Sequence, residues 1–384
     1  MLSSGEHVNR LVLIDGRLIG YRYGGIASYA RQLATRSPAF ARNECVRVAV
    51  RRNDLSLLDR SVRVFTPPHH RLERYAFGAE VMAHRPGLLH SVDYVQPVTP
   101  GVKSVATVHD LAFLDNPSLV TPESFNYYSQ IEQTLPSADR VIAVSTWTRD
   151  RLLYHLDLDS EMIDIVPNGY APDIFGPNER DDAGALSRLH PDLSGVIRSE
   201  RPIILAVGTI EPRKRYSILL SGFSDHWTEL ERLSGTSPIL VIAGQPGWLA
   251  DDTVSTLRML QRSGRAIWLR DIRDRELAAL YRQATLHVMP SADEGFGLPA
   301  LEAMASGTPS LVANVGALPE LVGDCGFIED SDQPVSWAEK IGRIVADPEI
   351  RDRRAQRGIE RATPLTWQET ARATMEIYRK VLDD

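Results

Sequence analysis

The chain has 384 residues, of which 43% are hydrophobic and 24% are charged, and its formal net charge at pH 7 is -7. This length suits two domains with sizeable cores, and the composition is that of an ordinary globular protein. The negative charge argues against a dedicated nucleic-acid binder. The two cysteines, Cys45 and Cys325, provide neither a disulfide framework nor a metal-ligand spacing, so we expect both to be small buried side chains.

The sequence shows no membrane or targeting signal. No apolar run reaches the roughly 18 residues that a spanning helix needs. Residues 1–10 are polar and lack the apolar core of a signal peptide. We therefore expect a cytoplasmic protein.

The first half of the chain alternates short apolar runs with helix-like segments. A helix is predicted over 26–33, and a second over 146–155, where Ser145 would cap it. Strands separated by helices indicate parallel pairing in an α/β sheet. The predicted strands cover residues 11–14, 46–50, 62–65, 88–90, 104–108, 141–144 and 163–166.

The second half repeats this pattern after a stretch rich in Pro, Asp, Asn and Gly. That stretch, residues 170–201, is interpreted as an inter-domain connection with a peripheral helix. The predicted strands that follow cover residues 202–207, 239–243, 266–269, 286–289 and 310–313. The predicted helices cover 273–284, 298–306, 316–322 and the amphipathic tail 367–382.

The fold class is therefore α/β, with two Rossmann-like domains. We place the first domain at residues 1–175 and the second at 176–366, with a C-terminal helix over 367–384 joining the first. In such sheets, ligands bind outside the carboxyl ends of the strands. If the two parallel sheets face each other, the ligand lies in the cleft between the domains.

A glycine-rich turn, residues 293–297, lies between the strand at 286–289 and the helix at 298–306. Free amides and the positive end of a helix dipole favour an anion such as a phosphate at this turn. Glu294 and Glu302 flank it. Eight residues along a helix rise about 12 Å, which disfavours a glycosidase pair, whose carboxyls lie about 5–9.5 Å apart. Solvated carboxylates are the alternative reading.

Three further positions could contribute chemistry. Arg213, Lys214 and Arg215 follow the strand that ends at Gly208 and could neutralise a diphosphate or form a solvated turn. His109 stands at a strand end, where it is either a hydrogen-bonding group in a cleft or a satisfied structural histidine.

Gly24 and Gly25 follow the first strand. Paired glycines are commonly simple turns, but their position suits a close approach of the backbone to a ligand.

These residues, in this order, resemble the retaining glycosyltransferases of family 4, which have the two-domain GT-B fold. The resemblance covers nearly the whole chain and includes the two glutamates separated by seven residues. Its other motifs are residues 14–17, 25–29, 90–94, 107–111, 144–145, 166–169, 207–214, 243–248 and 318–320. The resemblance is greatest to bacterial mannosyltransferases, on the sequence of residues 208–214 and on the pair Gly247-Trp248. Those enzymes use GDP-mannose on surface-polysaccharide or lipid-linked acceptors.

The resemblance implies roles for the residues around the glycine-rich turn. Glu302 would bind the ribose hydroxyls of the nucleotide and Glu294 the hydroxyls of the donor sugar. The amides of Phe296, Gly297 and Leu298 would face the diphosphate.

It also implies roles for residues outside the turn. Lys214 and Arg213 would stabilise the leaving diphosphate. Gly25, next to Gly24, would approach the phosphates from the other domain, and His109 would lie near the reacting sugar.

The same resemblance implies a reaction without a metal or other cofactor and without a protein nucleophile. The anomeric configuration would be retained through front-face attack, in which the leaving phosphate takes the acceptor proton. Three departures bear on donor binding: Thr209 stands where many relatives have Arg, Ala27 where they have Gly, and Leu269-Arg270 replaces a Gly-aromatic pair.

The acceptor is not identified by the sequence. An arginine-rich early segment and the group His69-His70-Arg71 could contact an anionic membrane surface or a lipid-diphosphate acceptor, or could simply be solvated. The arginines are Arg31, Arg36, Arg42, Arg47, Arg51 and Arg52. Alternatives for the whole chain are a transferase using a UDP- or dTDP-sugar, a nucleotide-sugar epimerase, a phosphorylase, and a catalytically silent glycan-binding subunit.

Overall fold

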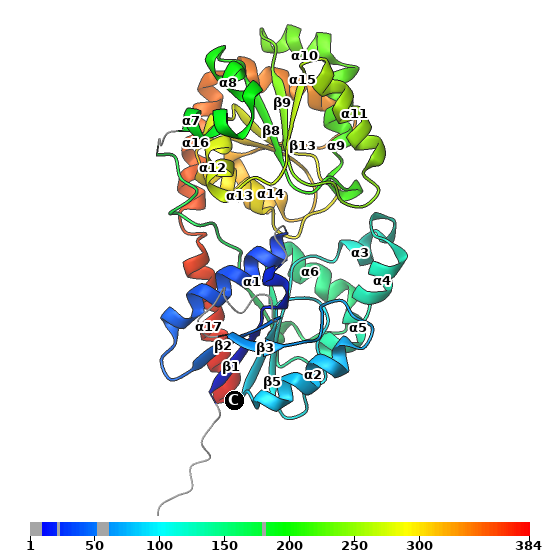
Figure 1. Ribbon diagram of the computed structural model, residues 1–384, viewed down its shortest axis with the longest axis vertical. Helices are drawn as coiled ribbons and strands as arrows, with labels where there is room; N and C mark the ends of the chain where they lie inside the picture. Colours follow the sequence, from blue (N-terminus) through cyan, green and yellow to red (C-terminus); the bar gives the residue numbers. More distant parts are fainter. Residues whose placement is uncertain (1–9, 21–23, 52–60, 179–181) are drawn as a thin grey trace, which may run out of the picture. The chain divides into compact units, whose positions relative to one another are not determined.

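The computed structural model describes residues 10–20, 24–51, 61–178 and 182–384, so Arg52 and residues 1–9 lie outside the described part of the chain. The chain forms two compact units (Figure 1). The first is Met1–Gly169 together with Trp367–Asp384, and the second is Tyr170–Thr366.

The first unit is built on a sheet of seven strands, and every neighbouring pair is parallel. The strand order is β3-β2-β1-β4-β5-β6-β7. The strands are β1 (Leu11–Asp15), β2 (Cys45–Arg51), β3 (Ser61–Val64), β4 (Leu88–Ser91), β5 (Lys103–Val108), β6 (Arg140–Ala143) and β7 (Ile163–Ile165).

Helices connect these strands. They are η1 (Arg17–Gly20), α1 (Gly25–Arg36), η2 (Ser37–Phe40), α2 (Glu73–His84), α3 (Ala112–Asp115), η4 (Pro117–Leu119), α4 (Pro122–Tyr128), α5 (Ile131–Thr134), η5 (Leu135–Ser137), α6 (Thr146–His155), η6 (Ser160–Met162) and the C-terminal α17 (Trp367–Asp383). Ser145 caps α6 as predicted, because its side chain accepts a hydrogen bond from the amide of Thr148.

The second unit contains a parallel sheet of six strands in the order β10-β9-β8-β11-β12-β13. The strands are β8 (Ile203–Val207), β9 (Ile239–Ala243), β10 (Ala266–Leu269), β11 (Leu286–Met289), β12 (Ser310–Ala313) and β13 (Phe327–Glu329). The helices are α7 (Asp182–Leu189), α8 (Pro191–Arg198), η7 (Pro212–Lys214), α9 (Tyr216–Ser224), α10 (Trp227–Ser234), α11 (Asp251–Arg262), α12 (Asp274–Gln283), α13 (Leu298–Ala305), α14 (Leu318–Val322), η8 (Gly323–Cys325), α15 (Pro334–Ala346) and α16 (Pro348–Ala362).

Each sheet reverses its strand order at one place. In the first unit β1 has β2 on one side and β4 on the other, and in the second unit β8 lies between β9 and β11. The carboxyl ends of the two strands at such a reversal splay apart and leave a crevice for ligands. The strand order therefore makes the ends of β1 and β4, and of β8 and β11, candidate positions for a ligand.

Helix α17 packs in the first unit, and Figure 1 shows it in red beside α1 and the strands of that unit. The Tyr378 hydroxyl lies 2.5 Å from Nδ1 of His90 on β4, and Nε2 of His90 lies 2.8 Å from the Thr107 hydroxyl on β5. Burial lowers the pKa of His90 to about 3, so the imidazole is neutral. A hydrogen-bonded chain thus ties the helix to two central strands.

The α/β fold with two Rossmann-like parallel sheets is confirmed, and several details differ from the sequence expectations. The compact units divide after Gly169 rather than after residue 175, because Tyr170 pairs with Thr366 of the second unit. The connection at 170–201 carries two helices instead of one, and the short strand β13 was not predicted. Cys325 is buried, but the expectation for Cys45 was wrong, since it lies exposed at the start of β2.

We predict that Tyr378→Phe lowers the unfolding temperature of the first unit. The change leaves Nδ1 of buried His90 without its partner, which costs about 1–3 kcal/mol and corresponds to several degrees. Differential scanning calorimetry measures the effect. Tyr154→Phe, at a largely exposed hydroxyl of the same unit, is the control. Equal effects of the two changes would contradict the role assigned to Tyr378.

Candidate functional site

The glycine-rich turn of the second unit connects β11 to α13, at the place where the strand order reverses. Gly297 precedes the helix with φ 101°, and a Cβ atom there would lie 2.7 Å from Cδ2 of Leu318, so only glycine fits. The amides of Phe296, Gly297 and Leu298 donate no hydrogen bond to any residue that the structure describes. These amides stand at the positive end of α13 and are available to an anion.

A buried ion pair holds this turn to the loop that follows β8. Nζ of Lys214 donates to Oε1 of Glu294 at 2.5 Å, and Nη1 of Arg213 lies 3.3 Å from Oε2 of the same carboxylate. The Ser291 hydroxyl donates to Oε1 at 2.7 Å. Glu294 and Lys214 are 7% and 9% exposed, so little water screens their charges.

The charges of this cluster decide the ionisation of Glu294. Burial raises the pKa of a carboxyl, but Lys214 and Arg213 outweigh burial and lower the pKa of Glu294 to about 2. The carboxylate is therefore ionised near neutral pH. The two cations predicted to bind a diphosphate face Glu294 in the structure, so an incoming anion has to share them with this carboxylate.

Backbone contacts fix the loops that carry these side chains. The amide of Ala292 donates to the carbonyl of Arg213 at 2.7 Å, and the amide of Ala317 donates to the carbonyl of Glu294 at 2.8 Å. Gly316 has φ 59°, and a Cβ there would lie 2.3 Å from that same carbonyl oxygen. The loops after β8, β11 and β12 thus meet at one place, which makes the cluster rigid.

Glu302 lies on α13 and is half-buried. The Tyr281 hydroxyl donates to its Oε2 at 3.2 Å. Burial, with a smaller contribution from the charge of Asp274, raises the pKa of Glu302 to about 8. The two glutamates predicted to serve different parts of one ligand therefore have opposite pKa shifts, which suits different tasks.

His109 and the glycine pair belong to the first unit. His109 follows β5, is buried, and its Nε2 lies 3.1 Å from the carbonyl of Val92. Its ring contacts that of Tyr29 edge-on at 4.9 Å, and burial lowers its pKa, so the ring is neutral near pH 7. Gly24 has φ 133° and precedes α1, which begins at Gly25. A Cβ at Gly24 would meet no atom of the described residues within 4 Å.

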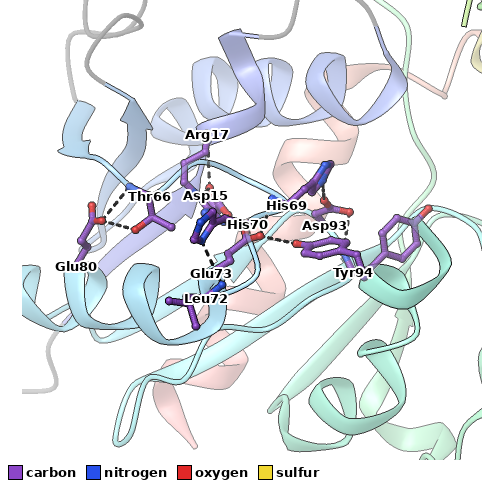
Figure 2. A network of polar contacts seen from close by, with 11 residues as sticks. Asp15, Arg17, Thr66, His69, His70, Leu72, Glu73, Glu80, Asp93 and Tyr94 are labelled. Atoms are coloured by element: carbon purple, nitrogen blue, oxygen red, sulfur yellow. Dashed lines mark hydrogen bonds and ion pairs between the residues drawn. The ribbon is translucent and has the colours of Figure 1, made fainter. Parts of the chain in front are cut away.

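Several polar residues at these sites were not predicted from the sequence. Ser291 was not singled out, although a hydroxyl three residues before Glu294 was the available signal. Glu211 was missed too; it is buried and accepts from Nε of Arg213 at 3.2 Å, and burial raises its pKa. A polar network in the first unit, which includes Asp15, Arg17 and Glu73, was also missed (Figure 2).

The described residues form neither a metal-binding cluster nor a membrane-spanning helix. No group of three or more His, Cys, Asp or Glu side chains in those residues is arranged to hold a metal ion. None of the helices formed by them is long and apolar enough to cross a bilayer.

Two family descriptions match most of the chain. Residues 194–361 match the family described as "Glycosyl transferases group 1", and residues 23–174 match "Glycosyltransferase Family 4". The first of these segments contains every residue of the cluster around Glu294.

Curated proteins similar to this chain carry the name D-inositol 3-phosphate glycosyltransferase. The chain is 31% identical to the one from Rhodococcus opacus over 319 residues, which is 78% of this chain and 69% of that protein. It is 29% identical to the one from Nocardioides sp. over 294 residues, which is 73% of this chain but only 62% of that protein. The match to the Nocardioides protein thus spans less than two thirds of its length.

Solved structures share the fold. Sucrose-phosphate synthase from Thermosynechococcus elongatus superposes with a TM-score of 0.75 at 22% identity, covering 97% of this chain and 99% of that chain. WaaG, a glycosyltransferase involved in lipopolysaccharide biosynthesis, gives 0.75 at 16% identity over 96% and 99%. Anabaena HepE in complex with UDP and glucose gives 0.72 at 17% identity over 97% and 99%. These identities establish a common fold.

We predict that Glu294→Gln destabilises the second unit and improves its binding of inorganic pyrophosphate. The change removes the buried counter-charge of Lys214 and Arg213, and breaking a buried pair costs about 3–5 kcal/mol. Pyrophosphate should then raise the melting temperature of the variant more than that of the wild type, because the anion no longer competes with a carboxylate.

Glu339→Gln is the matched control, since Glu339 forms an exposed pair with Arg343 in the same unit. An exposed pair contributes about 0–1 kcal/mol, so this control should melt like the wild type. A pyrophosphate shift in Glu294→Gln no larger than that of the wild type would contradict the competition between carboxylate and anion.

Proposed function

Since this chain belongs to the glycosyltransferases of group 1 and family 4 and has the GT-B fold, we propose that it transfers a hexosyl group from a nucleotide sugar to a hydroxyl group of a glycan or lipid-linked acceptor. The observation that carries the proposal is the cluster of Lys214, Arg213 and Glu294 beside the free amides that begin α13. Cations and amides in a buried setting suit a diphosphate, and a neighbouring carboxylate suits sugar hydroxyls.

The proposed mechanism depends on charge. The bond between the anomeric carbon and the diphosphate oxygen breaks, leaving an oxocarbenium-like sugar and a diphosphate anion. The acceptor oxygen attacks on the same face, and its proton passes to the leaving phosphate. Lys214, Arg213 and the amides of the turn stabilise the anion more as its charge develops, which lowers the barrier. The proposal assigns no protein nucleophile, no metal and no other cofactor.

The donor in this proposal is GDP-mannose. This choice rests on the sequence of residues 208–214 and on the pair Gly247-Trp248. The names of the characterised relatives specify neither mannose nor GDP, and one structure of the same fold contains UDP and glucose. A UDP- or dTDP-sugar is therefore the alternative donor. A nucleotide-sugar epimerase and a silent glycan-binding subunit are the alternative functions, and turnover of the donor distinguishes them.

The acceptor is proposed as a glycan or lipid-linked oligosaccharide, with a peripheral contact at the inner face of the membrane. D-inositol 3-phosphate, for which the relatives are named, is the competing acceptor. It differs from a glycan in carrying a phosphate group.

The test is a panel of nucleotide sugars with release of the nucleoside diphosphate as the readout. We expect one donor to be turned over and Lys214→Ala to lower kcat by about 10²–10³-fold, as when one donor to a developing anion is removed. Lys340→Ala, which removes a partly exposed lysine paired with Glu329 in the same unit, should turn over normally.

The donor assignment is tested separately by thermal shift with GDP and UDP. A response to UDP alone would overturn GDP-mannose while leaving the transferase in place. The transferase proposal would be overturned if no donor were turned over and if Glu302→Ala left nucleotide binding unchanged.

We also predict that nucleoside diphosphate binding strengthens as the pH rises through about 8. Ribose hydroxyls donate to a carboxylate, so the ligand favours ionised Glu302, whose pKa is raised to about 8. Such a group is only about one-tenth ionised at pH 7, and affinity should therefore rise up to about tenfold between pH 7 and pH 9, with proton release on binding. Isothermal titration calorimetry in buffers of different ionisation enthalpy measures both effects.

Two controls isolate Glu302 in this experiment. Glu302→Gln should bind with no such rise, and inorganic pyrophosphate, which lacks ribose, reports the protonation of the diphosphate itself. An identical pH profile for the wild type and Glu302→Gln would show that Glu302 does not contact the ribose.

A further inference from the structure

The first unit contains a polar network at its own reversal of strand order. Asp15 ends β1, and Asp93 follows β4, the strand beside it. Figure 2 shows these carboxylates with Arg17, Glu73 and His69 around them. The position corresponds to that of the Glu294 cluster in the second unit, because both lie where a parallel sheet opens to a ligand.

Arg17 is the centre of this network. Its Nε and Nη2 atoms donate to the two oxygens of Asp15 at 2.9 and 2.6 Å, and Nη2 also donates to Oε1 of Glu73 at 2.5 Å. The side chain is 4% exposed, with its guanidinium carbon 3.6 Å from the centre of the Phe77 ring. The Nη1 atom is buried without a hydrogen-bond partner among the described residues. A buried charged donor without an acceptor costs free energy, and a ligand oxygen would remove this cost.

His69 is held in place from several sides. Its Nε2 lies 2.8 Å from Oδ2 of Asp93, and its amide donates to Oε2 of Glu73 at 2.7 Å. The same oxygen accepts from the Tyr127 hydroxyl at 2.6 Å, and the rings of His69 and Tyr127 lie 4.9 Å apart. His69 has φ 61°, a left-handed conformation that is uncommon for residues other than glycine.

One nitrogen of this fixed imidazole stays available. The His69 side chain is 38% exposed, and its Nδ1 makes no hydrogen bond to a described residue. Burial lowers the pKa of His69, but the hydrogen bond to Asp93 and the charge of Asp93 raise it by more. Nδ1 accepts a hydrogen bond in the neutral ring and donates one in the cation, and a hydroxyl group suits both forms.

The charge of the network indicates the class of ligand. The carboxylates of Asp15, Glu73 and Asp93 outnumber Arg17 and His69, even when the imidazole is protonated. Carboxylates accept hydrogen bonds from hydroxyl groups and repel phosphates. Arg71 and Arg74 are close in sequence, but neither forms an ion pair with these carboxylates in the described part of the chain.

We propose that this network binds an uncharged, polyhydroxylated part of the acceptor, with the imidazole of His69, oriented by Asp93, hydrogen-bonding one of its hydroxyls. The inference rests on the proposed function, and it selects a neutral sugar over a phosphorylated polyol. His69 binds and positions the acceptor, and no covalent step is assigned to it. The Glu73 carboxylate accepts a hydrogen bond from the backbone amide of His69. It also accepts from Arg17 and Tyr127, which keeps both side chains close to His69.

The experiment compares matched neutral and phosphorylated probes by saturation-transfer NMR on the full chain. The pairs are myo-inositol against D-inositol 3-phosphate, and methyl α-D-mannopyranoside against mannose 6-phosphate. We expect a neutral probe to bind at least about tenfold more tightly than its phosphorylated counterpart, a ratio equivalent to about 1.4 kcal/mol. Tighter binding of the phosphorylated members, or no binding of either neutral probe, overturns the proposal.

Two variants locate the binding. Asp93→Asn and His69→Ala should weaken the neutral probe about tenfold while leaving the thermal shift by GDP or UDP, a property of the second unit, unchanged. Asp115→Asn is the matched control, because Asp115 holds His155 at the same 2.8 Å in the first unit and shares no hydrogen bond with this network among the described residues. Equal losses in Asp93→Asn and Asp115→Asn overturn the assignment to His69.

The outcome is separable from that of the proposed function. Donor turnover is measured by release of nucleoside diphosphate, whereas probe binding needs no turnover. If neutral probes bind at His69 but no donor is consumed, the proposed transferase function is wrong and the proposed polyol site is supported. If a donor is consumed and D-inositol 3-phosphate is the acceptor, the transferase stands and the inference drawn from the acidic network falls.

Discussion

The buried ion pair between Lys214 and Glu294 is the interaction on which the second unit's site depends. An ionised carboxylate at 7% exposure is tolerated only because two cations and a hydroxyl surround it. To make these contacts, the loops after β8 and β11 have to lie against each other, which in turn places the turn amides at the start of α13. The same pair keeps two cations together, and their mutual repulsion would otherwise separate them.

The strand pattern could be predicted because alternation of apolar runs and helices is a local property, and twelve of the predicted runs overlap the observed strands. The glutamates and cations of the site could be found as motifs. Their pairing could not, because Lys214 and Glu294 are 80 residues apart and meet only through the strand order. His69 was assigned to a membrane surface, a lipid-diphosphate acceptor or solvent, and its pairing with Asp93 was not predicted because Asp93 follows a different strand. Cys45 was assigned by residue type, whereas its exposure follows from its place at the start of β2.

The two units share the reversal of strand order but place side chains of opposite charge beside it. Each gathers charged side chains where its parallel sheet reverses strand order. In the second unit the cations stand beside free helix amides, an arrangement suited to an anion. In the first unit the carboxylates of Asp15 and Glu73 surround the guanidinium of Arg17, an arrangement suited to hydroxyl groups. If the two proposals hold, a similar backbone serves two chemically different ligands through the side chains of the loops at the strand ends.

The position of α17 has a consequence for synthesis. This helix packs in the first unit, yet it follows the whole of the second unit in the sequence. A ribosome therefore releases the complete second unit before α17 can pack in the first, and until then His90 lacks the Tyr378 hydroxyl as its partner. The first unit is therefore the first to be synthesised and the last to be completed. Between these two events the nascent chain exposes an incomplete core to chaperones.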